Sequence, residues 1–209
     1  MFRRIATTSA MLILAGAVTA WGDYPKPSPY PVSWELKFTH GVPTRVVVHV
    51  PGSDVPKAFW YMTYSLTNPI TNEGTKDQER DFYPVFEMLT EDGTVYRSDN
   101  NILPAVFDAI KAREGDRFME NANHMFGEIK LGEDQTRDGV AIWPETDVRM
   151  GTFTIFLSGI YGETADVKDS DGKPVTLHKT VELDYHINGD ESFAPGAVVG
   201  LVGTDSIMR

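Results

Sequence analysis

Carboxylates are the side chains of this 209-residue chain that are most available for chemistry. Asp and Glu number 30 against 19 Lys and Arg, five His are present, and Cys is absent. Glu145 and Asp147 closely follow Trp143, and an aromatic ring beside two carboxylates is typical of a sugar subsite. If Trp143 is exposed, it would suit contact with a glycan or a protein partner. If Trp143 lies in the core, Glu145 and Asp147 belong only to an ordinary loop after an edge strand. Trp143, Glu145 and Asp147 are therefore the candidate residues for contact with a ligand or partner.

The acidic run at 169–172 (Asp-Ser-Asp-Gly) partly resembles a calcium-binding loop. In the register that fits its Gly, Val167 and His178 would stand where oxygen ligands are needed. The run therefore predicts a hairpin turn, and with Asp166 it leaves only a weak cation site open. The five His show no paired metal-ligand spacing, and no Cys can join them. We predict neither a metal nor a cofactor.

Nucleophilic catalysis has no motif in the chain. There is no Cys, no Gly-x-Ser-x-Gly elbow and no Gly-rich phosphate loop, and Ser158 lies inside an expected strand. A triad that forms only in space is invisible to a sequence. We therefore predict a non-enzymatic binding or structural module, and we keep as the alternative a hydrolase or glycan-processing enzyme that uses loop carboxylates.

Residues 1–20 have the features of a secretory signal peptide. Arg3 and Arg4 precede a largely apolar stretch, and Val-Thr-Ala at 18–20 fits the cleavage site. The alternative is a membrane anchor, but threonines interrupt the stretch and shorten it below the roughly 20 apolar residues of a span. Cleavage leaves 17 basic against 30 acidic residues, a net charge of −13. We expect an exported protein, periplasmic or extracellular, that neither binds nucleic acid nor inserts stably into a membrane.

Between the ends of the chain, the hydrophobic pattern has a period of two. The alternation is clearest at 57–67, where aromatic and β-branched side chains predict a strand with Trp60 in the core. Asp-Gly turns at 91–94 and 169–172 separate neighbouring strands. The other expected strands are 34–38, 45–50, 82–90, 95–97, 126–131, 140–143, 152–160 and 176–187.

One segment, 102–113, has helical spacing instead. Asn101 can cap its start, Pro104 lies in its first turn, and Gly115 follows its end. Its apolar face is expected to pack across an open end or edge of the sheet. The polar residues expected to face water are Asp108, Lys111 and Glu114.

Short strands with one helix predict a mainly β fold, an antiparallel immunoglobulin-like β-sandwich with one inserted amphipathic helix. A small closed barrel fits the same periodicity. After the signal we expect a Pro-rich linker at 21–32, with Pro at every second position, and the sandwich domain at 33–190. A C-terminal tail at 191–209 completes the chain, and its Gly-rich part could be a terminal strand or could fray.

Five stretches, at 59–68, 81–87, 92–97, 102–106 and 138–144, resemble a family of uncharacterised exported bacterial proteins with an immunoglobulin-like domain. The first reads Phe-Trp-Tyr-Met-Thr-Tyr-Ser-Leu-Thr-Asn, and a short Asp-Gly turn follows the next strand. The resemblance covers roughly residues 33–162. It implies a sandwich and an exported location. It implies no catalytic residue and no ligand. Separately from the resemblance, we expect an unknown protein or glycan of the cell envelope as the partner.

Overall fold

The computed structural model describes residues 24–74, 77–98, 100, 103–144, 151–187 and 198–209. The chain is mainly β, with 50% of its residues in strands and 12% in helices, and its sheets are antiparallel, which confirms the predicted class. No helix in the described ranges is both long enough and apolar enough to cross a membrane. The signal peptide expected at residues 1–20 lies outside the described residues.

The first sheet is built around one long strand, β3 (Lys57–Thr67). β1 (Lys37–His40) and β2 (Thr44–Val48) pair with successive parts of the same edge of β3. β8 (Arg137–Pro144) pairs with its other edge, from Phe59 opposite Pro144 to Leu66 opposite Arg137. The bounds predicted for β3 are those observed, because uninterrupted alternation fixes both its face and its length.

The second sheet has the strand order β10-β11-β9-β5-β6, and β12 pairs with the remaining edge of β11. A separate pair of short strands, β4 (Arg80–Phe82) and β7 (Gly127–Ile129), lies beside the sheets. The strands of the second sheet are β5 (Phe86–Thr90), β6 (Val95–Arg97), β9 (Thr152–Leu157), β10 (Thr164–Lys168), β11 (Pro174–Ile187) and β12 (Val199–Met208).

The main core lies between the two sheets. Trp60, Met62 and Leu66 project from β3 toward residues such as Ile155 of β9 and Leu183 of β11, and each of these side chains is at most 2% exposed. Because successive strand residues point to opposite faces, the even-numbered residues of β3 share this face. The predicted core position of Trp60 is confirmed.

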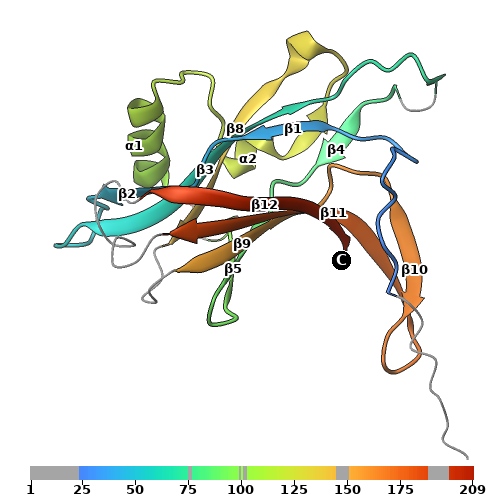
Figure 1. The fold of residues 1–209 in the computed structure, drawn as a ribbon. Coiled ribbons are helices and arrows are strands. Elements are labelled where there is room, and N and C mark those ends of the chain that lie inside the picture. Colours follow the sequence, from blue (N-terminus) through green and yellow to red (C-terminus); the bar gives the residue numbers. More distant parts are fainter. Residues whose placement is uncertain (1–23, 75–76, 99, 101–102, 145–150, 188–197) are drawn as a thin grey trace, which may run out of the picture.

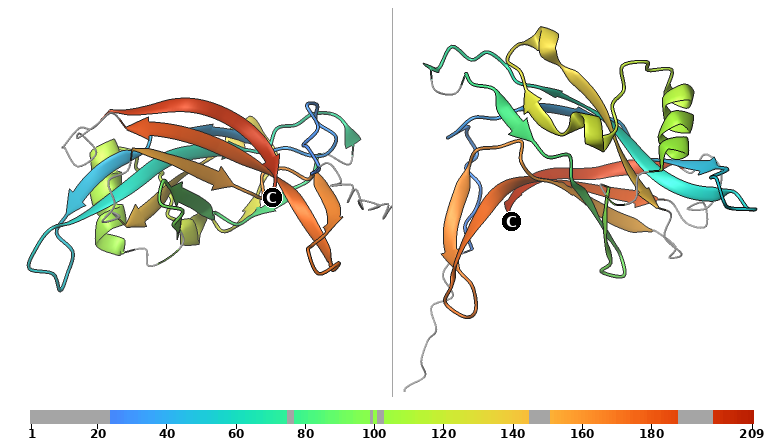
Figure 2. Two further views of the ribbon diagram at one scale, coloured as in Figure 1. Left: turned by 60° about the horizontal axis from the view of Figure 1, so that its bottom comes forward. Right: turned by 180° about the vertical axis from the view of Figure 1, so that it is seen from behind.

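The opposite face of the first sheet is also buried, and here the expected packing of the helix is wrong. α1 (Pro104–Glu114) lies across this face rather than at an end or edge of the sheet (Figures 1 and 2). Phe59 and Tyr61 of β3 join Phe107 and Ile110 of α1 in a second hydrophobic core. We call this the helix core. Both faces of β3 are therefore covered where α1 lies, which explains why Phe59 and Tyr61 are buried as well as their even-numbered neighbours.

The ends of α1 follow the expected chemistry only in part. Gly115 stops the helix in the left-handed conformation, with φ of 68°, as predicted. Leu103 takes the N-cap position, and Asn101 lies outside the described residues. Lys111 does not simply face water, because its ammonium donates to the Met119 carbonyl at 2.8 Å and lies over the Phe107 ring. The expectation for Lys111 is therefore wrong.

One strand, β10, is absent from the predicted strands. β12 lies within the predicted tail at 191–209 and corresponds to the terminal-strand alternative for its Gly-rich part. It pairs with β11 over nine positions, from Lys179 opposite Met208 to Ile187 opposite Val199. Glycines lower the strand propensity of β12, but a partner strand supplies the ladder that the local sequence does not favour.

The Pro-rich segment at 24–32 also packs onto the domain instead of leading freely away from it. The Tyr24 hydroxyl donates to the Met208 carbonyl at 2.9 Å, and the Ser28 amide donates to the Glu163 carboxylate at 2.7 Å. We call this segment the strap. Both predicted Asp-Gly turns are present as hairpins, with Gly93 at φ of 83° and Gly172 at φ of 78°.

Candidate functional site

Trp143 is a core residue, so the prediction that it contacts a ligand is wrong. Its side chain is 0% exposed, packs edge-on against Phe86 and donates from Nε1 to the Phe86 carbonyl at 3.2 Å. Glu145 and Asp147 lie outside the described residues. The structure therefore gives no geometry for a pair of catalytic carboxylates at this position.

A cleft lies near the same end of β8, on the face opposite to Trp143. Ile142 and Pro144, the neighbours of Trp143 in the strand, line this cleft next to α1. Alternation along a strand places residues two apart on the same face, whereas Trp143 points toward the main core. The cleft is therefore lined by the residues on either side of Trp143 in the strand, and not by Trp143 itself.

This cleft, which we call the helix cleft, has a volume of about 400 Å³ and lies between the first sheet, α1 and β6. Phe59, Val106 and Ile142 form its apolar floor and are each at most 8% exposed. Val95 and Leu103, which are 46% and 38% exposed, add apolar surface nearer its mouth. Cavities that hold small ligands are commonly 300–1,000 Å³ and mostly apolar, so the helix cleft has suitable size and lining.

The position of α1 explains why a hollow remains at this place. The helix begins at Pro104, and Leu103 before it is in an extended conformation, so the helical layer stops short of this end of β3. β6 belongs to the second sheet but approaches the end of β8, and it contributes Val95, Tyr96 and Arg97 to the lining. Three layers of the molecule therefore meet around the cleft without filling it.

The charge of the helix cleft is opposite to that of the chain. Its charged lining residues are both basic, Lys57 and Arg97, and no Asp or Glu occurs among the lining residues that the structure describes. The whole chain has a formal net charge of −11. Lys57 is exposed and makes no ion pair within the described residues. An ammonium group beside apolar walls can bind an anion that carries a hydrocarbon part.

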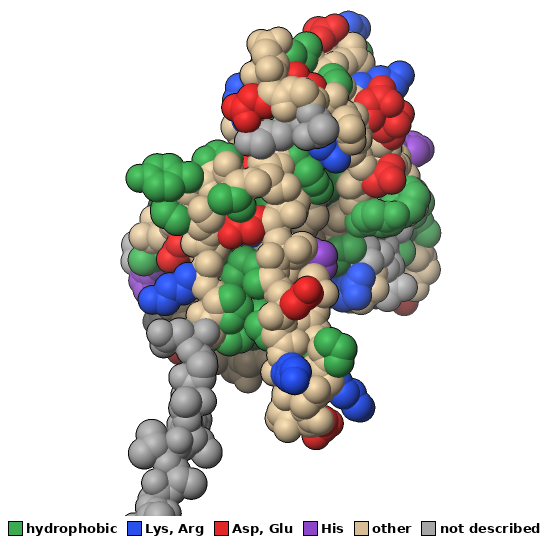
Figure 3. Space-filling model, turned by 90° about the vertical axis from the view of Figure 1, so that its right-hand side faces the viewer, with side chains coloured by type: hydrophobic (Ala, Val, Ile, Leu, Met, Phe, Trp, Pro, Cys, Tyr) green, Lys and Arg blue, Asp and Glu red, His purple; other side chains and the backbone are tan. Residues whose placement is uncertain are grey.

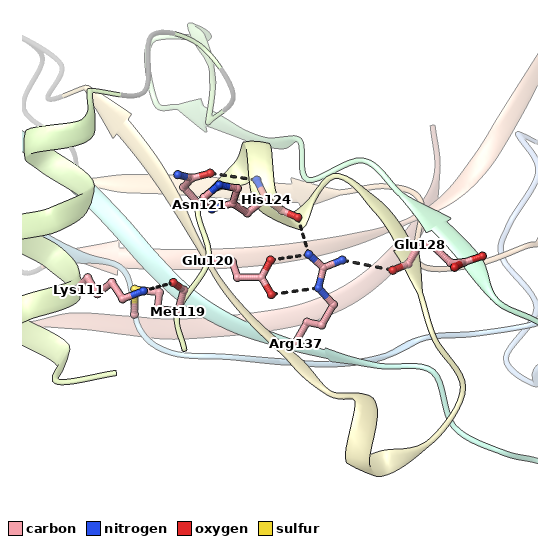
Figure 4. A network of polar contacts seen from close by, with 7 residues as sticks. All are labelled: Lys111, Met119, Glu120, Asn121, His124, Glu128 and Arg137. Atoms are coloured by element: carbon pink, nitrogen blue, oxygen red, sulfur yellow. Dashed lines mark hydrogen bonds and ion pairs between the residues drawn. The ribbon is translucent and has the colours of Figure 1, made fainter. Parts of the chain in front are cut away.

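A charged clamp holds the segment that carries α1. Arg137, at the start of β8, donates to both carboxylate oxygens of Glu120 and to the carbonyls of His124 and Glu128 (Figure 4). Arg137 and Glu120 are only 22% and 29% exposed in their side chains, and their closest N–O distance is 2.5 Å. Such bidentate charge-assisted pairs are strong and directional. The clamp fixes the chain between α1 and β8 to the start of β8.

The polar loop at 68–80 is organised by its own contacts. Asp77 accepts hydrogen bonds from the Thr71 amide, the Thr71 hydroxyl and the Asn72 amide, and these bonds hold the pKa of Asp77 below its usual value. Asn68, at its base, is 3% exposed and donates to the Gln78 and Ile129 carbonyls. Its described polar groups mainly stabilise the loop itself.

A second groove, of about 560 Å³, lies beside the outer face of the second sheet near the chain end. Its charged groups neutralise each other, since Arg209 pairs with Glu87 at 2.6 Å and lies over the Phe156 ring. On the face shown in Figure 3, acidic and basic side chains are scattered between separate hydrophobic patches. The helix cleft is distinguished from this groove by its unpaired Lys57.

No short sequence motif predicts the helix cleft. Lys57 and Phe59 lie on β3 and Arg97 lies on β6, and only the three-dimensional fold brings these two strands together at the cleft. Among the described residues, no group of three or more His, Asp or Glu side chains is arranged to hold a metal ion. Comparison with protein-family models, with curated proteins and with solved structures finds no match.

Proposed function

We propose that this protein is an exported, non-enzymatic binding module with an immunoglobulin-like sandwich, and that the helix cleft holds its ligand. The observation that carries the proposal is a mainly apolar cleft whose charged lining residues are both basic, in a chain of formal net charge −11. Of the two, Lys57 is exposed and makes no ion pair within the described residues, so its charge faces the mouth of the cleft.

The chemistry of the lining favours a small amphiphilic anion. Apolar walls gain about 25 cal/mol for each Å² of hydrocarbon removed from water, while Lys57 attracts a carboxylate or similar group at the mouth. A medium-chain fatty acid is the simplest molecule with both parts. A protein or glycan of the envelope, the partner expected from the sequence, is the alternative occupant of this surface.

Calorimetric titration with three amphiphiles that share an unbranched ten-carbon chain tests the proposal. Decanoate should bind, decanol should bind more weakly, and decyltrimethylammonium should bind weakest of all. Lys57→Glu should weaken decanoate by about fivefold to tenfold, because it replaces an attraction with a repulsion. Lys168→Glu, at an exposed lysine of β10, is the matched control and should leave binding unchanged.

Leu103→Trp distinguishes binding in the helix cleft from binding elsewhere on the protein surface. Leu103 is 38% exposed at the cleft, so a larger side chain can be placed there without entering a core. The change should block decanoate and leave the unfolding free energy nearly unaltered. Equal binding of all three amphiphiles would show that the charge of Lys57 does not contribute to recognition. Absence of binding by any of them would refute the cleft as an amphiphile site.

Export has its own test. The signal features at residues 1–20 predict a mature protein that begins at Trp21, and N-terminal sequencing of the protein recovered outside the cytoplasm should find it. Recovery of the chain with an intact Met1 in a membrane fraction would indicate that residues 1–20 are a membrane anchor and not a cleaved signal. The enzymatic alternative would need Glu145 and Asp147, and glycoside hydrolysis lost in both Glu145→Gln and Asp147→Asn would favour it.

A further inference from the structure

β12 is an edge strand of the second sheet, and only part of its outer edge is covered. Its inner edge pairs with β11 from Val199 to Met208. Along the outer edge, the described residues provide no ladder partner. An unpaired edge presents a row of N–H and C=O groups that can pair with another strand, so proteins normally protect such edges.

The strap protects the C-terminal half of this edge. Residues 24–27 and residues 205–209 line a shared hollow, and the Tyr24 hydroxyl donates to the Met208 carbonyl at 2.9 Å. Pro25 and Pro27 have no N–H group, so the strap shields the edge but cannot extend the sheet. Asp205 adds a charge to this half of the strand.

The N-terminal half of the edge, residues 198–204, has neither kind of protection. It contains no charged residue and no Pro, and Val198, Leu201 and Val202 are 66%, 48% and 71% exposed. The one feature here that disturbs the edge is a local bulge, where a register shift opposite Asp184 and Tyr185 leaves Val202 without a partner in β11. This stretch of β12 is therefore apolar, exposed and open for pairing.

We propose that a second copy of this chain pairs with residues 199–204 in an antiparallel arrangement across a twofold axis. An antiparallel edge is complementary to its own copy, because each strand offers the same N–H and C=O groups in reverse order. The two second sheets would then form one continuous sheet. Leu201 and Val202 of each copy would lie next to those of the other.

Charge favours a second copy at this stretch. The formal net charge of −11 makes two copies repel each other over most approaches, but 198–204 is uncharged. In a register centred on Val202, where the twofold axis lies between Val202 and its copy, Asp205 lies opposite Val199 of the other chain, so no two carboxylates face each other. The contact is small compared with the roughly 1,200–2,000 Å² of a stable interface, so the dimer should be weak and dependent on concentration.

Sedimentation equilibrium of the full protein, from micromolar to millimolar concentration, measures this association. Dimer should form toward the upper end, and added salt should strengthen it by screening the repulsion between copies. Val202→Lys should raise the dissociation constant at least tenfold, since edge lysines prevent strand pairing. The matched control is Val47→Lys, because Val47 is 54% exposed on β2, an edge strand of the first sheet.

Hydrogen exchange locates the contact independently. Amides within 199–204 should become more protected as the protein concentration rises, while those of β2 should not. A monomer at every concentration would overturn the proposal. So would a dimer that responds equally to Val202→Lys and Val47→Lys, or one whose formation leaves the 199–204 amides unprotected.

Discussion

The two faces of the first sheet are covered by different kinds of layer. On the main-core face, the second sheet leaves Met62, Leu66 and Trp143 0% exposed. On the helix face, Phe59 and Ile142 retain 8% and 7% exposure beneath α1. An eleven-residue helix is about 16 Å long, whereas an eleven-residue strand extends about 36 Å. A sheet can cover a sheet completely, but one short helix cannot.

The difference shows where a small β-rich protein has room for a ligand. On the face covered by a sheet, the side chains pack into the main core and leave no room for a ligand. Trp143, the aromatic residue that the sequence suggested as a contact residue, is buried there. The helix face keeps an apolar strip beyond the first turn of α1, and that strip forms the floor of the helix cleft.

Trp60→Ala should have the largest effect, because it removes the central aromatic side chain of the main core. Trp60 is 2% exposed and packs against Phe153 of the second sheet. We expect a loss of about 3–5 kcal/mol in unfolding free energy, measured by urea denaturation, and cooperative unfolding of the whole domain. A variant that melts within about 2 °C of the parent protein would contradict this assignment of the core face.

Ile110→Ala should cost less and act more locally. Ile110 is 0% exposed, but it lies in the helix core, which is smaller than the main core. We expect a loss toward the lower end of about 2–5 kcal/mol, together with faster hydrogen exchange in α1 than in β11. Asp108→Ala, at an exposed position of the same helix, should leave both measurements unchanged. Equal loosening of α1 and β11 would mean that both faces form one cooperative unit.

Arg137→Gln should weaken the charged clamp without disturbing either core. Hydrogen bonds to charged groups contribute about 1.5–3 kcal/mol, and Arg137 binds Glu120 through two of its nitrogens. A double-mutant cycle with Glu120→Gln should recover most of the loss as coupling between the two residues. Lys130→Gln is the exposed control and should have little effect. Additive losses would show that the two side chains act independently.

Glu182→Gln should have the smallest effect and the opposite sign. Burial and the nearby Asp184 and Asp205 raise the pKa of Glu182, and Asp205 is its direct cross-strand partner on β12. A raised carboxyl pKa in the folded state gives stability that is complete below about pH 4 and is lost as the pH rises through the folded pKa.

Glu182→Gln should therefore stabilise the protein by about 0.2–1 kcal/mol at pH 7 and not at all near pH 3.5. Urea denaturation at both pH values provides the measurement. Asp205→Asn should reproduce part of the gain, because it removes the same cross-strand repulsion. A gain that is equal at both pH values would rule out repulsion between carboxylates as its cause.

Local sequence signals predicted the parts of the fold that depend on neighbouring residues. The alternation in β3, the Asp-Gly turn at Gly93 and the stop of α1 at Gly115 all arise from short-range preferences. The face of Trp143 depends on Phe86, which is distant in the sequence, and the Gly-rich β12 depends on β11 for its ladder because its own residues have low strand propensity. The helix cleft depends on three layers at once, and therefore no spacing of residue types could reveal it.

The position of β3 at the centre of its sheet has a consequence for how fast the protein folds. Its partner β8 is about 70–85 residues further along the chain, so this pairing must close a long loop before it contributes any stability. Proteins dominated by such distant contacts fold in milliseconds to seconds rather than microseconds. During synthesis, β3 also emerges well before β8, with its apolar edge unpaired. A nascent chain that has reached residue 100 should therefore be prone to aggregate, and the complete chain should not.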